Sequence, residues 1–481
     1  MVKEMTHGKS TKLIFLFMIP LLIGHIIQQL YNMTDLIIVG KFVGVNALAG
    51  VGVAGSLLFM SIGFIIGLCN GFSVVLAQRF GAKSKVGVRR CITTSIYLSL
   101  FFTIIITIFM AVFAHSFLLL LNTPDEIIDS ALTYILILSY GTFAVISYNL
   151  FSGMLRSIGD SKTPLYFLIF AAILNIFLDY ITIAIFNFGV TGSAISTVTS
   201  QIISSVLCAA YMFKKYKLLR PKKSDWKIKW AYVWVHIKIA LPMALEFAVT
   251  SVGIIILQGA INSLGPNIVA GFTAAMKIEN LIIAAFIALA SAVATYTAQN
   301  FGAKNYQRIV SGAKSNIIIG MTLCLIFSLL LFFFWDVFVG FFVSEGNFEV
   351  KSAARQYMLI AILNYPVLCL LITFRSLVQS LGRTIAPILA GFSEVFMRSL
   401  GAFSLVSLFG YTGVCFSPIL SWYAAFIIII ISYTFGLKKL KKEFNVKGES
   451  LPVDEDYDDI SRDFTIPNTS QIIYTDNISE E

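Results

Sequence analysis

Long apolar stretches separated by short polar segments run through almost the whole chain. Six stretches contain no Asp, Glu, Lys or Arg, and each exceeds the roughly 20 residues that a membrane-spanning helix needs. They cover residues 42–78, 91–124, 130–155, 180–213, 247–276 and 399–437. Dividing the longest of them at Gly, Pro and Asn positions, where helices tend to end, predicts twelve spans. These spans are residues 13–38, 48–77, 91–120, 131–154, 164–186, 190–213, 234–262, 270–298, 313–343, 354–377, 386–408 and 413–436.

The pattern therefore predicts an all-α polytopic membrane protein with twelve transmembrane helices. Of the 481 residues, 58% are hydrophobic and only 12% are charged, whereas a typical soluble domain has about 25% charged residues. So few charges could not cover the surface of a soluble protein of this size. This composition excludes a soluble enzyme, a nucleic-acid-binding module and a disordered scaffold.

Positive charges are concentrated on one side of the predicted spans. If both termini are inside, the inner segments carry 28 Lys and Arg residues and the outer segments carry three, namely Lys41, Lys351 and Arg355. Cytoplasmic loops are enriched in Lys and Arg in this way. We therefore expect a multi-pass protein of the cell membrane with both termini cytoplasmic. The net charge of +10 then reflects topology and not nucleic-acid binding.

The sequence contains an internal repeat. LAQRFGAK at 76–83 recurs as TAQNFGAK at 297–304, and GVTG at 189–192 recurs as GYTG at 410–413, both with the same offset of 221 in the numbering. Each half would hold six spans, so equivalent loops lie on the same side of the membrane and the repeat is parallel. We expect two six-helix lobes related by a pseudo-two-fold axis, as in alternating-access transporters. The predicted units are an N-lobe at 1–217, a basic cytoplasmic linker at 218–233, a C-lobe at 234–445 and an acidic, disordered cytoplasmic tail at 446–481.

Two carboxylates occur where the pattern predicts lipid. Asp35 lies late in the first span and Asp179 lies in the fifth, and the same spacing separates each from a preceding proline, which places them at a similar depth. A carboxylate at the bilayer centre costs about 2.5–3.5 kcal/mol unless it is paired, protonated or bound to a cation. Asn175 lies one helical turn before Asp179, and Thr197 could add a hydroxyl. These oxygens suit Na⁺, but two close carboxylates could instead share a proton, or both could simply accept hydrogen bonds from neighbouring helices.

Three of the charged residues in the predicted spans of the second half are candidate site residues. Glu394 and Arg398 are four residues apart, a spacing that favours a local ion pair, while Glu246 has no partner nearby in the sequence and is a candidate cavity acid. For the ion pair, a functional and a structural role are both open. No P-loop, HExxH or GxSxG motif occurs. We therefore expect no enzymatic activity, no cofactor, and transport driven by an ion gradient.

Several segments resemble the bacterial branch of the multidrug and toxic compound extrusion (MATE) family. They are YNMTDLIIVGKFVGVNALAGVG, AQRFGAK, RSIGDSKTP and GVTGSAIST, together with the repeated AQNFGAK and GYTG. The resemblance covers about residues 10–440, including both lobes. It implies twelve helices in two lobes, and export of organic cations in exchange for Na⁺ or H⁺.

The resemblance also implies roles for particular residues. It places a cation-coupling site, for Na⁺ or H⁺, at Asp35, Asn175, Asp179 and Thr197. Pro20 matches the proline at which helix 1 of some members bends, and Glu246 matches an acid found in helix 7 of several members. Some members carry an Asp in helix 10, but the tenth span is apolar until Arg375. The resemblance therefore does not support a second Na⁺ site in the C-lobe.

Together these features predict a secondary active antiporter that exports organic cations or drugs by alternating access. The expected partners are small cationic or amphiphilic substrates and the lipid bilayer, without nucleic acid, and the expected oligomeric state is a monomer. One alternative is a flippase for lipids or lipid-linked oligosaccharides from the same broader superfamily, which twelve spans and an acidic N-lobe argue against. Another is a channel-like or purely structural membrane protein.

Overall fold

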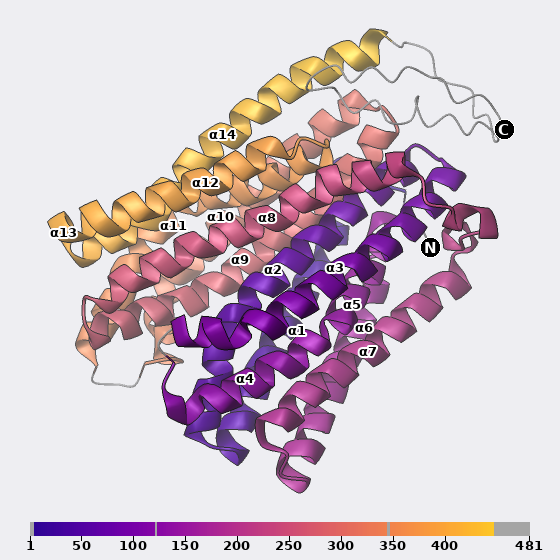
Figure 1. Ribbon diagram of the computed structural model, residues 1–481. Helices are drawn as coiled ribbons and strands as arrows, with labels where there is room; N and C mark the ends of the chain where they lie inside the picture. The colour runs from indigo at the N-terminus through magenta and orange to yellow at the C-terminus, as the bar shows by residue number, and fades with distance from the viewer. Residues whose placement is uncertain (1–3, 121–122, 344–346, 447–481) are drawn as a thin grey trace.

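The computed structural model describes residues 4–120, 123–343 and 347–446, which form long helices joined by short connections (Figure 1). These residues include no β-strand. Eleven helices are long and apolar enough to cross a membrane, and counting the bent pair α4–α5 as one span gives twelve. The all-α polytopic fold is thus confirmed, while the predicted tail lies almost wholly outside the described residues. The α-helices are α1 (Ser10–Phe42), α2 (Val45–Gly81), α3 (Lys85–Leu120), α4 (Asp125–Tyr140), α5 (Thr142–Ser157), α6 (Lys162–Asp179), α7 (Gly189–Lys215), α8 (Trp230–Asn262), α9 (Pro266–Gly302), α10 (Tyr306–Gly340), α11 (Phe348–Ser380), α12 (Ile385–Leu400), α13 (Val406–Phe409) and α14 (Tyr411–Val446).

Two spans contain a π-helical turn at equivalent places in the repeat. The first turn, η1 (Tyr180–Ile185), continues α6, and the second, η4 (Gly401–Leu405), continues α12. Their starting residues, 180 and 401, differ by 221, which is the offset of the sequence repeat. The fold thus repeats a local backbone distortion as well as the order of the helices, although the two turns share no obvious sequence motif.

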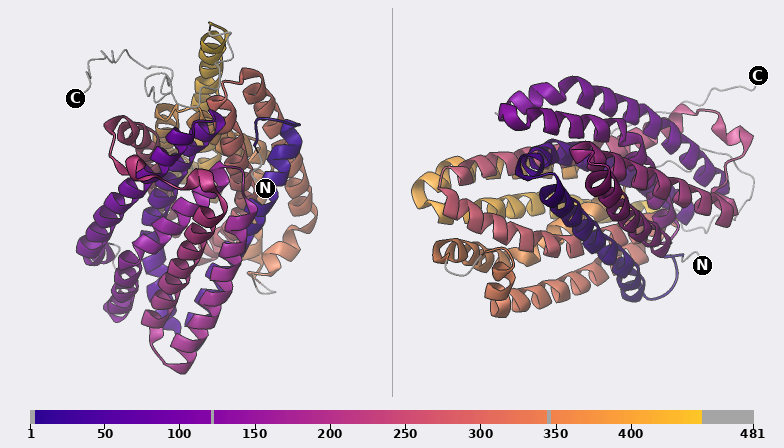
Figure 2. Two further views of the ribbon diagram at one scale, coloured as in Figure 1. Left: turned by 90° about the vertical axis from the view of Figure 1, so that its right-hand side faces the viewer. Right: turned by 90° about the horizontal axis from the view of Figure 1, so that it is seen from below.

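The helices form two lobes, with α1–α7 in the N-lobe and α8–α14 in the C-lobe, and each lobe has its own apolar core (Figures 1 and 2). Three helices contribute to both cores: α9 adds Ala298 to the N-lobe core, while α1 and α8 pass from one core to the other along their length. Near the start of α1, Ile14 and Phe17 lie in the C-lobe core, whereas Val39 near its end lies in the N-lobe core. In α8, Ile239 lies in the N-lobe core and Ile261 lies in the C-lobe core. The first helix of each lobe therefore crosses to the other lobe near its beginning.

The repeated AQxFGAK segments meet each other between the lobes. They lie at the end of the bundle where α1 begins and α14 ends, which we call the inner end. Gln78 donates to the carbonyl of Ser380 and Gln299 donates to the carbonyl of Ser157, both at 2.8 Å. Both glutamines are buried. The two copies of the motif therefore make equivalent contacts on either side of the pseudo-two-fold axis.

Glycines in the same motif allow the backbones of α2 and α9 to approach closely. A Cβ atom on Gly81 would lie 1.9 Å from the carbonyl oxygen of Gln299, and one on Gly302 would lie 1.9 Å from that of Gln78. No other residue type fits at such a distance, so these glycines are required by packing. We call Gln78, Gly81, Gln299 and Gly302 the inner contact, and it joins the lobes at the inner end.

The segment before α1 is attached to the C-lobe. Arg308 of α10 donates to the carbonyl oxygens of Met5 and Gly8 and to the side chain of Asn300, each at 2.9 Å. The side chain of Met5 is 1% exposed. The described residues before α1 are therefore held on the other lobe and add to the contact between lobes at the inner end.

Candidate functional site

The four predicted cation-coupling residues lie together in the N-lobe. Asp35 is on α1, Asn175 and Asp179 are on α6, and Thr197 is on α7. Asn175 donates to the hydroxyl of Thr197 at 3.3 Å. The carboxyl groups of Asp35 and Asp179 are close enough to interact with each other. Three helices that are distant in the sequence therefore place the four predicted side chains around one point.

Several oxygens at this point have no hydrogen-bond partner. Neither carboxylate oxygen of Asp179 has a partner among the described residues, nor does the side-chain oxygen of Asn175. Both side chains are 0% exposed, so protein atoms and not solvent surround them. An unsatisfied buried carboxylate is costly. The set of carboxylate, amide and hydroxyl oxygens therefore fits a hard monovalent cation or a proton.

Three further residues complete the site, and sequence reasoning missed them. Ser193 donates to a carboxylate oxygen of Asp35 at 2.7 Å, and Tyr31 donates to the hydroxyl of Thr197 at 3.3 Å. Tyr134, which is 6% exposed, lies beside Ser193 and Asp35. Ser193 could have been found, because it lies four residues before Thr197 and therefore on the same face of α7. No comparable signal links Tyr134 to the site.

Local backbone features explain how the acids are presented. Asp179 is the last residue of α6, and the π-helical turn η1 follows it directly. Such turns shift the helix register and often occur at functional sites. Across from the turn, a Cβ atom on Gly192 would lie 2.9 Å from the hydroxyl of Thr182, so glycine there allows α7 to pack closely on η1. This packing brings Ser193 and Thr197 toward the carboxylates.

Comparison with known proteins identifies the family. The MatE family model matches residues 20–181 and 242–404, more than half of the chain, and the two matched segments begin at Pro20 and Pro242. The chain belongs to the MATE family. A curated relative is the probable multidrug resistance protein YpnP of Bacillus subtilis, 26% identical over 92% of this chain and 99% of the relative. Another is the probable multidrug resistance protein NorM of Thermotoga maritima, 23% identical over 81% of this chain and 84% of the relative. A solved MOP superfamily transporter from Pyrococcus furiosus has a TM-score of 0.83 and 24% identity, covering 91% of this chain and 98% of that one.

Pro20 lies within a continuous helix in this MATE protein. It is buried in α1, which extends unbroken from Ser10 to Phe42. The bend that the family resemblance implies at this position stays a prediction. Pro20 precedes Asp35 on the same helix, so a bend there would move the inner part of α1 relative to the cation-coupling site.

The charged residues predicted in the C-lobe form one buried cluster. Arg375 of α11 pairs with Glu246 at 3.0 Å and also with Glu394, while Arg398 lies 3.6 Å from Glu394. Gln379 adds a hydrogen bond to Glu246 at 2.5 Å. Glu246 is therefore paired in the structure, although it has no partner in the local sequence. The Glu394–Arg398 pair is present, and Arg375 is the residue of this cluster that sequence reasoning missed.

A further buried carboxylate lies close to this cluster. Glu279 of α9 is 2% exposed and accepts a hydrogen bond from Tyr357 at 2.9 Å. Arg398 is close enough to interact with it electrostatically. The C-lobe cluster is thus largely neutralised by its own arginines, whereas the described residues around Asp35 and Asp179 supply no ion pair. Among the described residues, the N-lobe therefore offers carboxylates without an ion-pair partner, whereas the carboxylates of the C-lobe cluster lie beside arginines.

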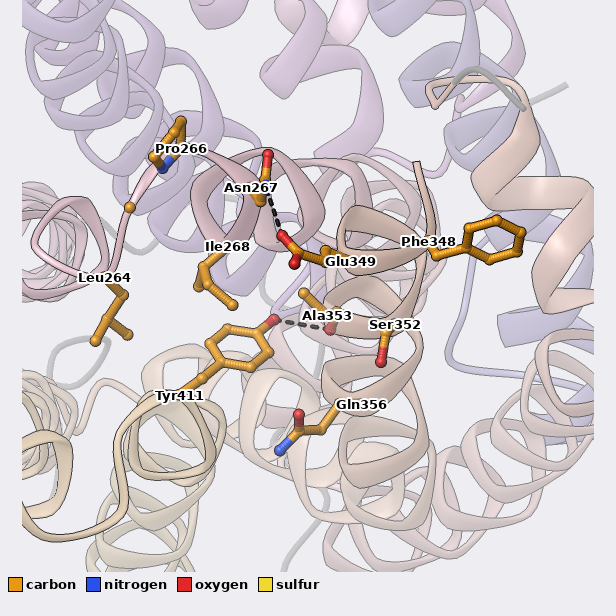
Figure 3. Close-up of a pocket in the computed structure, with 11 residues that line it drawn as sticks. Leu264, Pro266, Asn267, Ile268, Phe348, Glu349, Ser352, Ala353, Gln356 and Tyr411 are labelled. Carbon is orange, nitrogen blue, oxygen red and sulfur yellow. Dashed lines mark hydrogen bonds between the residues drawn. The ribbon is translucent and has the colours of Figure 1, made fainter. Parts of the chain in front are cut away.

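A hollow of about 560 Å³ lies at the outer end of the C-lobe, opposite the inner end (Figure 3). Several of its polar groups already bond within the protein: Asn267 donates to Glu349, and Tyr411 donates to the carbonyl of Ala353 at 2.9 Å. None of the predicted site residues lines it. We therefore do not assign it to the transport site.

Proposed function

We propose that this MATE protein is a secondary active antiporter that exports small organic cations or amphiphilic drugs in exchange for Na⁺ or H⁺. The observation that carries the proposal is Asp179, whose two carboxylate oxygens are fully buried and have no partner among the described residues. Its relatives that are named as probable multidrug resistance proteins support the substrate class. An alternative role as a flippase is not favoured by these relatives.

In this mechanism, the coupling cation binds among Asp35, Asn175, Asp179 and Thr197 from the outer side. Binding of one monovalent cation neutralises one of the two buried negative charges, and a carboxylate at the bilayer centre costs about 2.5–3.5 kcal/mol. The coupling cation and the exported cation must then favour different conformations, because only a difference in affinity between two states can drive exchange. Ser193 and Tyr31 hold the side chains of Asp35 and Thr197 in place while the cation is absent.

We further propose that the two lobes, the N-lobe at 1–217 and the C-lobe at 234–445, rock relative to each other, so that the inner contact is closed in one conformation and open in the other. The inner end faces the cytoplasm in this proposal, because the basic segments of the chain lie there. The protein works as a monomer, since each chain has both lobes. The buried cluster around Arg375 then has a structural role and holds α8, α11 and α12 together.

The test uses purified protein in proteoliposomes, with ethidium as the exported cation. We expect an imposed Na⁺ or H⁺ gradient to drive ethidium transport by the wild type, and Asp179→Asn to abolish it. The matched control is Asp336→Asn, because Asp336, near the end of α10, is 61% exposed and its ion pair among the described residues is with Lys351. This control should transport at the wild-type rate.

Each outcome of this test bears on one part of the proposal. Dependence on a Na⁺ gradient alone, or on a proton gradient alone, identifies the coupling ion. Full transport by Asp179→Asn would overturn the assigned coupling site. Transport of a fluorescent lipid but not of ethidium would favour the flippase instead.

A further inference from the structure

A second hollow, of about 320 Å³, lies beside the linker, between α3 and the start of α8. Its wall is mostly apolar and aromatic, with Tyr97 and Phe101 from α3 and Trp230 and Val233 from α8. Lys227 of the linker is the charged residue that lines it. We call this hollow the linker groove.

The linker is fixed to α3 beside the groove. Asp225 forms an ion pair with Arg89 at 2.7 Å, and its carbonyl accepts a hydrogen bond from Thr93 at 2.8 Å. The ring of Trp226 packs edge-on against Tyr97, with 5.7 Å between the ring centroids. These contacts place Lys227 at the groove and hold it there. The groove is therefore formed by the protein's own packing.

The exposed charge on this part of the linker is entirely positive. Asp225 is its one acid, and it is buried and paired. Lys222, Lys223 and Lys227 are exposed. A surface of this charge beside an apolar hollow suits a molecule with an anionic head and an apolar tail, and does not suit the cationic substrates proposed for the transport site.

The position of the groove also fits the edge of a bilayer. Helix α3 has 36 residues, which gives a length of about 54 Å, whereas the hydrocarbon core of a bilayer is about 30 Å thick. Its first turns therefore extend beyond the hydrocarbon, and the groove lies near headgroup level. Large aromatic side chains are exposed there, since Trp230 is 79% exposed and Trp234 is 53% exposed. Trp residues prefer this interfacial region.

We propose that the linker groove binds an anionic phospholipid of the inner leaflet, with an acyl chain in the hollow and the phosphate at Lys227. This inference rests on the proposed orientation, in which the inner end is cytoplasmic. The start of α8 that lines the groove packs with α3 in the N-lobe core, whereas the outer part of the same helix packs in the C-lobe core. A lipid in the groove therefore contacts α8 on its N-lobe side, before that helix continues into the C-lobe.

The test measures quenching of tryptophan fluorescence by brominated lipids in nanodiscs, without substrate or ion gradient. Three of the five Trp residues, Trp226, Trp230 and Trp234, lie in or beside the linker. Dibrominated phosphatidylglycerol should quench more strongly than the same fraction of dibrominated phosphatidylcholine. Lys227→Gln should lower the relative affinity for phosphatidylglycerol about fivefold, the contribution expected of one lysine near an anionic surface.

The matched control is Lys314→Gln, which removes an exposed lysine of α10 at the same end of the bundle. It should retain the wild-type preference. Equal quenching by the two lipids would overturn the proposal, as would an equal loss of preference in both variants, because ordinary boundary lipid would explain either result. Relief of quenching by added ethidium would also overturn it, since a cationic substrate would then occupy the groove. The test does not require transport, so its failure is separate from failure of the antiporter proposal.

Discussion

Substituting alanine for Gly81 should shift the protein away from the conformation described here. The new methyl group would lie 1.9 Å from the carbonyl oxygen of Gln299, whereas ordinary contacts begin at 3.4 Å. Because this carbonyl oxygen belongs to the backbone, no side-chain rotation can relieve the clash. Helices α2 and α9 must therefore move apart at the inner end until this distance returns to the ordinary range.

The size of this effect can be stated from general packing energies. Overpacking a tight contact costs about 1–3 kcal/mol, which corresponds to a shift of about 5- to 160-fold in the equilibrium toward conformations with the inner contact open. The matched control is Gly52→Ala in the same helix, where a Cβ atom meets nothing within 4 Å. Both substitutions replace glycine by alanine in α2, and the propensity gain is larger at the interior position 52 than at the helix end, so it cannot produce an opening confined to Gly81→Ala.

Spin labels at Ala82→Cys and Ala303→Cys would report the separation of the lobes at the inner end. Both positions are exposed, and the six native cysteines are buried. Double electron–electron resonance should show a longer distance in Gly81→Ala and an unchanged distribution in Gly52→Ala. An unchanged distribution in folded Gly81→Ala would refute the reasoning, and so would an equal shift in the two variants.

Three further substitutions test other parts of the structure. Arg375→Met leaves two buried carboxylates without their shared partner and should lower the free energy of unfolding by about 3–5 kcal/mol. Lys351→Met, at an exposed pair, should lower it by less than about 1 kcal/mol. The two variants are compared by their thermal unfolding in detergent. Ser193→Ala removes the hydrogen bond that stabilises unbound Asp35, so the coupling cation should be held more tightly, and the ion concentration for half-maximal ethidium efflux should fall about fivefold or more. Arg308→Gln removes three charged hydrogen bonds around the start of the chain and should raise amide hydrogen exchange at residues 5–8 at least about tenfold, as measured by mass spectrometry.

Each of these three predictions has an outcome that contradicts it. If Arg375→Met and Lys351→Met lower the unfolding temperature equally, the buried cluster does not contribute more than a surface pair. An unchanged ion titration in Ser193→Ala would remove Ser193 from the coupling site. Unchanged exchange before α1 in Arg308→Gln would mean that packing of Met5, and not the arginine, fixes this segment.

The sequence predicted the fold because the bilayer constrains each helix almost independently. The spans and the pairing of Glu394 with Arg398 can be predicted from residue spacing within one segment, and the repeat from short motifs that recur. All three appear in the structure. The bend between α4 and α5 was not predicted: it measures 47° and occurs at Gly141, where a Cβ atom would lie 2.2 Å from Val198 of α7. That constraint comes from a neighbouring helix that is distant in the sequence, and it leaves no local pattern.

The same distinction applies to the candidate site residues. Asp35 and Asp179 could be identified because a carboxylate in an apolar span is unusual wherever it occurs. The partner of Glu246 could not be identified, because Arg375 lies on a different helix, and the packing of α12 against both α8 and α11 brings them together. Residues that are unusual for their surroundings can be found from sequence, whereas partners that depend on tertiary packing cannot.

The repeat duplicates the scaffold but not the chemistry of the coupling site. The inner contact and the π-helical turns recur at the offset of 221, yet the positions that correspond to Asp35 and Asp179 are Ile256 and Leu400. In the proposed mechanism one lobe therefore supplies the oxygens that bind the cation, and the other lobe must respond through structural contacts. Helix α1 provides it, because Asp35 lies in its outer part while Phe17 packs in the C-lobe core. A change at the cation site that moves α1 is thus transmitted directly to the opposite lobe.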